Sequence, residues 1–245
     1  MNSTVDKTEV NHFDKPNQDW WDESGSFSAL HRLTPCRVEY IIQVIKRNII
    51  NKYINSSTQI CNNLNILDVG CGGGLLCEPL SRLGGNVTGI DVSENAIITA
   101  KQHASKMGLK INYICTSLEE LNLKKDFDLI IASEVIEHVL DRKYFLKMIR
   151  KISSNKTSFI FTTINKSIPS LLFGKFAAEY ILNLIPKGTH DWEKFVTPQK
   201  LYLEALENGI YLNNFSGLTP NIFNKEFNLT SYLGINYAAS GIVRE

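Results

Sequence analysis

Between residues 65 and 164 the chain alternates short apolar runs with amphipathic segments, and this alternation constrains the fold more than any other feature. The runs that we expect to form strands are 65–70, 86–91, 111–116, 127–133 and 158–164. Strands that alternate with helices indicate a parallel, doubly wound sheet. The continuous apolar run 127–133 suits a strand that is covered on both faces of such a sheet.

Capping residues mark the helix ends. Ser93 suits an N-cap and Gly108 a C-cap, because a serine oxygen accepts from free N–H groups and glycine tolerates the left-handed conformation that ends helices.

Residues 1–18 read as a flexible polar arm, and residues 165–195 interrupt the alternation. Further helices are expected at 75–84 and 142–152, after Pro35 and after Thr197-Pro198, with a late strand at 235–244.

The composition narrows the class of protein. The chain has 245 residues, is 43% hydrophobic and carries a formal net charge of +1, which argues against nonspecific nucleic-acid binding by a basic face. Its five cysteines show no C-x-x-C spacing, so we expect reduced thiols rather than a zinc ribbon or a disulfide framework. The N-terminus shows neither an apolar signal core nor an arginine-rich presequence, which predicts a protein that stays where it is made.

The stretch LDVGCGGGLL crowds four glycines into residues 70–74, directly after the first expected strand. Glycine loses more backbone entropy on folding than any other residue, so such a cluster indicates a sharp turn at which the backbone approaches a ligand closely. In doubly wound folds the ligand lies at the carboxyl ends of the strands. Asp91 ends the second expected strand, where its carboxylate can accept hydrogen bonds from both hydroxyls of a ribose.

Two classes of nucleotide ligand use this layout. Dinucleotide sites carry G-x-G-x-x-G, whereas here Asp68 precedes Gly70, Gly72 and Gly74 in the spacing D-x-G-x-G-x-G. A carboxylate beside the loop suits a ligand with an ammonium group better than a pyrophosphate. S-adenosylmethionine is such a ligand, and the loop resembles the cofactor loop of class I methyltransferases. An NAD site and a glycine-rich turn without a ligand are the weaker alternatives.

Longer stretches carry a more specific resemblance. The stretches WWDESGSFSALHRLTPCRVEYI, LDVGCGGGLL, GIDVSENAI, EVIEHV, AEYILNLIPKGTHDWEKFVTP and INY occur in the order found in the ubiquinone biosynthesis O-methyltransferases. The chain resembles that family from Trp20 to its C-terminus. This resemblance implies a Rossmann-like doubly wound sheet, the class I methyltransferase fold, with N-terminal helices and a helical insertion after the fifth strand. It also implies a single domain over 19–245.

The same resemblance implies an activity and a set of site residues. The family methylates hydroxyls of polyprenylated catechol and quinol rings with S-adenosylmethionine, and one enzyme of the family serves two such steps. Matching positions place cofactor contacts at Arg37, Gly70, Asp91 and Ser133. The fork of Arg37 would pair with the methionine carboxylate, and Ser133 would line the cofactor site. The alternatives are a solvated helix charge for Arg37 and an ordinary turn for Ser133.

Glu134, Glu137 and His138 have the spacing i, i+3, i+4, which on a helix places them on one face. Such a cluster could hold a divalent ion that lowers the pKa of a phenol and orients its oxygen. The resemblance implies Mg²⁺ here, although Mg²⁺ prefers oxygen ligands and a histidine suits Zn²⁺ or Mn²⁺ better. The alternative is that these residues only cap and pack a helix.

The segment 168–185 is apolar except for a few polar residues, of which Lys175, Glu179 and Asn183 form a narrow stripe. It is too short and too charged to span a bilayer. Two interpretations remain, a lid that is buried against the core and a helix that lies in the membrane interface. The wide apolar face and the prenyl tail of the implied substrate favour the second.

His190 and Asp191 follow this segment. They are candidates for the base that takes the phenolic proton, and the alternative is that they only fix a loop.

Competing functions are a methyltransferase for RNA or protein, a dehydrogenase, and a scaffold that binds cofactor without turnover. The chain lacks an N-P-P-Y or D-P-P-Y stretch after the fourth expected strand. We expect as partners a polyprenylated substrate, membrane lipid and other ubiquinone-biosynthesis proteins, and no nucleic acid. The expected location is the cytoplasm, peripheral on the inner face of the cell membrane, or the matrix side in mitochondria.

Overall fold

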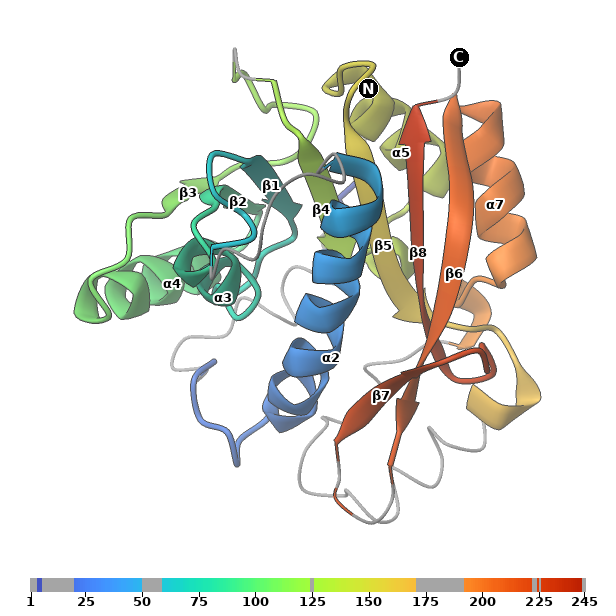
Figure 1. The fold of residues 1–245 in the computed structure, drawn as a ribbon, viewed down its shortest axis with the longest axis horizontal. Helices are drawn as coiled ribbons and strands as arrows, with labels where there is room; N and C mark the ends of the chain where they lie inside the picture. Colours follow the sequence, from blue (N-terminus) through green and yellow to red (C-terminus); the bar gives the residue numbers. More distant parts are fainter. Residues whose placement is uncertain are drawn as a thin grey trace.

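The computed structural model describes residues 4–5, 20–49, 59–123, 126–170, 192–221, 224 and 226–243. These residues form one eight-stranded sheet in the order β3-β2-β1-β4-β5-β8-β6-β7 (Figure 1). The five strands expected between residues 65 and 164 are all present. The strands are β1 (Asn65–Val69), β2 (Asn86–Asp91), β3 (Asn112–Cys115), β4 (Leu129–Ser133), β5 (Ser158–Ile164), β6 (Ile210–Pro220), β7 (Phe227–Thr230) and β8 (Asn236–Val243).

The sheet is parallel in one half and antiparallel in the other. Strands β1 to β5 pair in parallel, which confirms the doubly wound arrangement. β8 pairs antiparallel with β5, and its arrow in Figure 1 points the opposite way; β6 pairs antiparallel with both β8 and β7. The parallel arrangement that was expected for the alternating region does not extend to β6–β8, for which the sequence analysis predicted no strand direction. The short connection between β6 and β7 favours their antiparallel pairing, whereas β8 pairs with β5 and β6, neither of which directly precedes it in the sequence.

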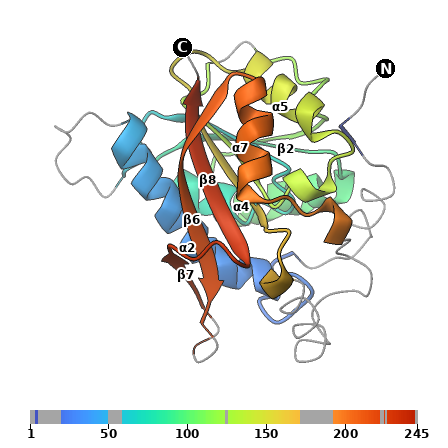
Figure 2. The ribbon, with the colours of Figure 1, turned by 90° about the vertical axis from the view of Figure 1, so that its right-hand side faces the viewer.

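Helices cover both faces of the sheet, as Figures 1 and 2 show. One face packs against α2 (Ser28–Val44), α3 (Cys77–Arg82) and α4 (Glu94–Lys106), and the other against α5 (Arg142–Lys151) and α7 (Pro198–Glu207). Each face has its own core of buried side chains. Shorter turns are a π-helical turn at Ile45–Ile49 and 3-10 turns at Ile136–His138 and Trp192–Lys194.

The capping predictions are confirmed. The Ser93 hydroxyl accepts from the Ala96 N–H at 3.1 Å, and Gly108 has a φ of +68°. The start of α2 differs from the expectation, because the helix begins at Ser28 and contains Pro35. A proline inside a helix removes one backbone donor. The missing donor would have bonded the His31 carbonyl. One residue earlier, the Leu30 carbonyl accepts from Thr34 Oγ1 at 2.7 Å and from Arg37 Nη2 at 3.2 Å.

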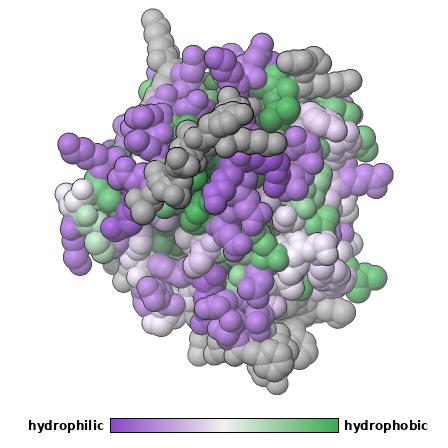
Figure 3. All heavy atoms as spheres, viewed as in Figure 1, coloured by the Kyte–Doolittle hydropathy of each residue, from purple (hydrophilic) through white to green (hydrophobic). Residues whose placement is uncertain are grey.

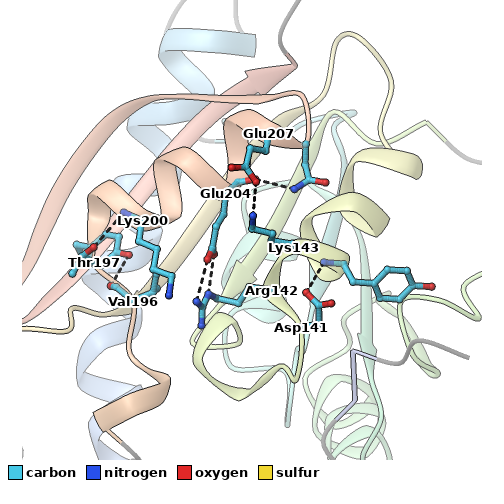
Figure 4. A network of polar contacts seen from close by, with 11 residues as sticks. Asp141, Arg142, Lys143, Val196, Thr197, Lys200, Glu204 and Glu207 are labelled. Atoms are coloured by element: carbon cyan, nitrogen blue, oxygen red, sulfur yellow. Dashed lines mark hydrogen bonds and ion pairs between the residues drawn. The ribbon is translucent and has the colours of Figure 1, made fainter.

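Polar side chains dominate the described part of the surface in Figure 3, with apolar side chains scattered among them. On the far side of the sheet a network of charged groups joins α5 to α7 (Figure 4). There Arg142 donates to both carboxylate oxygens of Glu204, from Nε at 2.9 Å and from Nη2 at 3.1 Å. Lys143 Nζ lies 2.7 Å from Glu207 Oε2. No helix within the described ranges combines the length and apolarity needed to cross a bilayer.

The described part of the expected N-terminal arm contacts the rest of the protein. Val5 forms an isolated antiparallel bridge with Val139, and the Leu140 N–H donates to the Thr4 carbonyl at 3.1 Å. Two residues of the arm are therefore placed against the loop that follows β4.

Candidate functional site

The glycine loop after β1 has a left-handed backbone at three positions. Gly70, Gly72 and Gly74 have φ values of +72°, +51° and +88°, which residues with a side chain rarely adopt. The N–H groups of Gly70 and Cys71 donate to the Ile90 carbonyl at 2.8 and 3.0 Å. These bonds tie the loop to the end of β2, so the sharp turn lies at the carboxyl ends of the strands.

Asp91 lies at the end of β2 beside this loop. Its Oδ2 accepts from the Gly72 N–H and its Oδ1 from the Ser93 N–H, both at 2.8 Å. These two bonds fix the orientation of the carboxylate beside the loop. The structure therefore brings Gly70, Gly72 and Asp91 together at one edge of the sheet.

Asp68 lies in β1 just ahead of the loop and is 2% exposed. Its Oδ2 accepts from the Cys77 thiol at 3.2 Å. Burial raises the pKa of Asp68 to about 6, and the Cys77 hydrogen bond and the Arg37 guanidinium act in the opposite direction. A cation bound beside the loop would favour the ionised carboxylate in the same way.

Arg37 reaches from α2 to the end of β4 and is 4% exposed, so the alternative of a solvated charge is wrong. Its Nη1 donates to Ser133 Oγ at 2.8 Å and its Nη2 to Thr34 Oγ1 at 2.7 Å. Its Nε has no hydrogen-bond partner, and no ion pair joins Arg37 to a carboxylate within the described residues. Burial lowers the pKa of this guanidinium. The carboxylates of Glu134 and Asp68 oppose this effect, but no described carboxylate lies within ion-pair distance of the guanidinium. A buried cation without a direct ion pair is costly, so the arrangement suits an anionic group of a ligand.

A chain of hydroxyl groups continues from Arg37 across β4 and β5. Ser133 Oγ lies 2.8 Å from Thr162 Oγ1, and the Thr162 hydroxyl donates to Glu134 Oε1 at 2.7 Å. Glu134 has a φ of +56°, a strained conformation for a residue with a side chain. Burial, followed by the nearby Glu137 carboxylate, raises the pKa of Glu134 to about 7. The predicted cofactor residue Ser133 is thus connected through the Thr162 hydroxyl to Glu134, whose backbone is strained.

Glu134, Glu137 and His138 do not lie on one face of a helix. Only Ile136–His138 form a single 3-10 turn, because the left-handed backbone at Glu134 cannot belong to a right-handed helix. Glu137 is buried, and its Oε2 accepts from the Thr163 hydroxyl at 2.7 Å. Within the described ranges no group of three or more His, Cys, Asp or Glu side chains is placed to hold a metal ion. As placed, the three residues do not fit Mg²⁺, and the ion stays a prediction.

The other predicted site residues lie outside the described residues. These are His190, Asp191 and nearly all of the segment 168–185, since the description stops at Ser170 and resumes at Trp192.

The sequence analysis missed the two threonines of β5 that bind the glutamates. Thr162 and Thr163 are both buried at the carboxyl end of the strand. The signal was the pair of hydroxyl residues that ends the otherwise apolar stretch SFIFTTI. Buried hydroxyls need hydrogen-bond partners, and here the partners are carboxylates.

Both raised pKa values predict how stability depends on pH. Because the folded form of the cofactor-free protein binds protons at Asp68 and Glu134 more tightly than the unfolded chain does, their contribution to the free energy of unfolding is present below pH 4. It is lost as the pH rises through about 6 and about 7. The double variant Asp68→Asn, Glu134→Gln is expected to gain stability relative to the wild type over this range. Urea unfolding at several pH values measures the difference. If the free energies of unfolding of the wild type and the variant change in parallel with pH, the prediction is wrong.

The comparisons with known proteins fit this geometry. A family model described as a methyltransferase domain matches residues 67–161, which run from the middle of β1 into β5. The structure is similar to magnesium protoporphyrin IX methyltransferase from Synechocystis PCC 6803 with bound SAH, with a TM-score of 0.63 at 15% identity, covering 97% of this chain and 94% of that one. It is also similar to a SAM dependent methyltransferase from Aquifex aeolicus, with a TM-score of 0.57 at 16% identity, covering 98% and 99% of the two chains. These likenesses confirm the class I methyltransferase fold.

Curated relatives match almost the whole chain at higher identity. A ubiquinone biosynthesis O-methyltransferase from Pelagibacter ubique is 42% identical over 97% of this chain and 97% of its own. The protein of the same name from Rickettsia prowazekii is 40% identical over 96% of this chain and 90% of its own. Similarity of this degree over nearly the full length shows that the chain belongs to the ubiquinone biosynthesis O-methyltransferase family.

Proposed function

We propose that this O-methyltransferase moves the methyl group of S-adenosylmethionine to a ring hydroxyl of a polyprenylated phenol or quinol. The observation that carries the proposal is the buried guanidinium of Arg37, which has no carboxylate partner among the described residues. The methionine carboxylate of the cofactor would supply that partner through a charge-assisted pair. Ser133 would hold the guanidinium in place through the bond from Nη1 at 2.8 Å.

The glycine loop would bind the remainder of the cofactor. Asp68 and the left-handed backbone at Gly70 would face the ammonium group, and Asp91 would accept from the ribose hydroxyls. Gly72 supports this role, because its N–H already orients the Asp91 carboxylate. The two ends of the cofactor would thus be fixed by opposite charges, Arg37 at the carboxylate and Asp91 at the ribose.

The transfer itself would be a direct in-line displacement. A phenolate oxygen of the acceptor attacks the sulfonium methyl, the carbon–sulfur bond breaks, and its electron pair remains on sulfur as a thioether. The protein would contribute orientation and exclusion of water rather than a covalent intermediate. The phenolic proton would leave to His190 or Asp191, which remain candidates from the sequence alone.

An assay with purified protein tests the activity and the metal together. We expect label from S-adenosylmethionine to appear on a ring oxygen of a catechol that carries a short prenyl chain, and not on RNA or protein. Cofactor binding without turnover would instead support the scaffold alternative. Loss of activity in EDTA and recovery with Mg²⁺ would support an ion at Glu134, Glu137 and His138. Full activity in EDTA would return these residues to a packing role.

We also propose that the segment 168–185 contacts the inner face of the membrane, where a prenylated substrate and other ubiquinone-biosynthesis proteins would be reached. The support is its sequence, which is apolar apart from a narrow polar stripe. The double variant Leu172→Glu, Phe176→Glu removes two apolar side chains, each worth roughly 1.5–3 kcal/mol of burial. Binding to phosphatidylcholine vesicles should fall by roughly a hundredfold or more in a sedimentation assay.

Lys175→Glu is the matched control, because it makes the same change in net charge on the polar stripe. It should keep vesicle binding. Turnover of a tail-less catechol should survive in the double variant, and turnover of a long-tailed substrate in vesicles should collapse. A loss of stability with equal damage to both substrates would identify the segment as an internal lid.

A further inference from the structure

Two of the three tryptophans of the chain lie on the glycine loop. Trp20 is 7% exposed, and its ring occupies the space in which side chains at Gly72 and Gly73 would otherwise stand. A Cβ at Gly72 would lie 2.5 Å from Trp20 Cη2, and one at Gly73 would lie 2.4 Å from Trp20 Cγ. The missing side chains of the loop therefore make room for this indole, in addition to any ligand.

Trp21 ties the same loop to the helices that follow it. Its Nε1 donates to the Gly73 carbonyl at 3.1 Å, and its ring stacks on His103 of α4 with centroids 3.5 Å apart and planes 9° apart. His103 Nδ1 in turn lies 2.6 Å from Oε1 of Glu78, a buried residue of α3. The loop, α3 and α4 thus share one set of contacts with the N-terminal segment.

The segment also reaches the helix that carries Arg37. Trp20 stacks on Phe27 at 3.8 Å with planes 9° apart, and Phe27 is the residue directly before α2. His31 of α2 holds the Trp20 carbonyl through Nε2 at 2.9 Å. The rings of Trp20 and Phe27 form a small core with Leu75 and Ala96 that is separate from the two main cores. The two sides of the candidate cofactor site, the glycine loop and α2, are therefore joined by these rings.

We propose that Trp20 and Trp21 are positioning residues for the cofactor, which hold the Gly72–Gly74 loop and the Arg37 helix at the spacing that the cofactor bridges. This inference rests on the proposed function, because it takes the loop and Arg37 as the cofactor site. The tryptophans act through the loop backbone and the helix. A ligand that bridges two elements favours the contacts that set their spacing. Cofactor binding and the contacts of Trp20 and Trp21 with the loop and the helix therefore stabilise each other.

A double-mutant cycle between Trp20→Ala and Gly72→Ala tests the coupling of ring and loop. Alanine at Gly72 collides with the far edge of the indole, so Gly72→Ala should weaken binding of S-adenosylhomocysteine by at least tenfold in the wild-type background. In the Trp20→Ala background the collision is gone and only the strain of the left-handed backbone at Gly72 remains, so the same change should cost less. Additive effects in calorimetry would overturn the proposal.

Steady-state kinetics separate positioning from simple stabilisation of the fold. Trp21→Phe keeps a ring over His103 but removes the bond to the Gly73 carbonyl. We expect the KM for S-adenosylmethionine to rise several-fold with kcat unchanged, and Trp20→Phe to recover part of the affinity that Trp20→Ala loses. A lower kcat with an unchanged KM would show a purely structural role and would overturn the inference.

Tyr211→Ala is the matched control, since Tyr211 also belongs to an aromatic pair, with Tyr202, at the opposite edge of the sheet. Its cofactor affinity should equal that of the wild type. Adding S-adenosylhomocysteine should slow amide exchange over residues 20–31 in the wild type and leave residues 202–211 unchanged. If Asp91→Ala loses the cofactor while the tryptophan variants and the exchange pattern do not respond, the cofactor site stands and the positioning role fails. If Asp91→Ala itself still binds, the proposed site fails first.

Discussion

Asp91→Ala is expected to abolish cofactor binding while the protein stays folded. The change removes the proposed acceptor for two ribose hydroxyls and the bond that holds the Gly72 N–H at 2.8 Å. Hydrogen bonds to a charged group are worth about 1.5–3 kcal/mol each, so losing two should weaken binding by roughly a hundredfold or more. Titration calorimetry with S-adenosylhomocysteine measures the loss.

Asp128→Ala is the matched control for this variant. Asp128 also bridges two neighbouring strands, because its Oδ2 accepts from the Asn65 N–H at 2.8 Å, but it does so at the amino ends of the strands. The control should lower stability by a similar amount and leave cofactor affinity unchanged. Near-normal affinity of Asp91→Ala would remove this aspartate from the cofactor site.

Arg37→Met is expected to lose the cofactor without destabilising the cofactor-free protein. Removing one member of a desolvated charge pair costs about 2–5 kcal/mol of binding, which corresponds to a loss of roughly 30-fold or more in affinity. In the absence of the cofactor the guanidinium is buried with no carboxylate partner among the described residues. An apolar side chain of similar length should therefore leave the free energy of unfolding unchanged or raise it.

Arg142→Met should show the reverse pattern. Its guanidinium is matched by the Glu204 carboxylate at 2.9 and 3.1 Å, and the loss of the arginine leaves that largely buried acid without its fork. The free energy of unfolding should fall by about 3 kcal/mol with cofactor affinity unchanged. Urea unfolding and calorimetry on both variants give the comparison. A large loss of stability in Arg37→Met would show that Arg37 serves the fold instead.

Features that depend on a few neighbouring residues could be predicted from the sequence. Ser93 caps α4 through a bond to the residue three positions on, and Gly108 ends that helix through its own backbone conformation. The glycine loop and Asp91 were found because their spacing follows from the order of strand, turn and helix. The family resemblance added Arg37 and Ser133, for which no local signal exists, because they meet across 96 positions of the chain.

Features that depend on distant contacts could not be predicted. The left-handed backbone at Glu134 is accompanied by the bond from Thr162 of β5, and nothing near Glu134 in the sequence indicates it. For that reason the spacing of Glu134, Glu137 and His138 does not become a shared helix face. The glycines were attributed to a ligand alone, whereas the structure also fills their missing side-chain positions with Trp20, Val135 and the Tyr113 hydroxyl.

The position of β8 has a consequence for synthesis of the chain. β8 follows β6 and β7 in the sequence but lies between β5 and β6 in the sheet, so β6 and β7 have no link to the sheet without it. On the ribosome the first five strands can assemble early, while the open edge of β5 waits for residues 236–243. Until then an unpaired edge is exposed to other nascent chains, and such edges promote aggregation. Completion of this sheet therefore waits until residues 236–243 have left the ribosome, and chains that stop before β8 should be captured by chaperones.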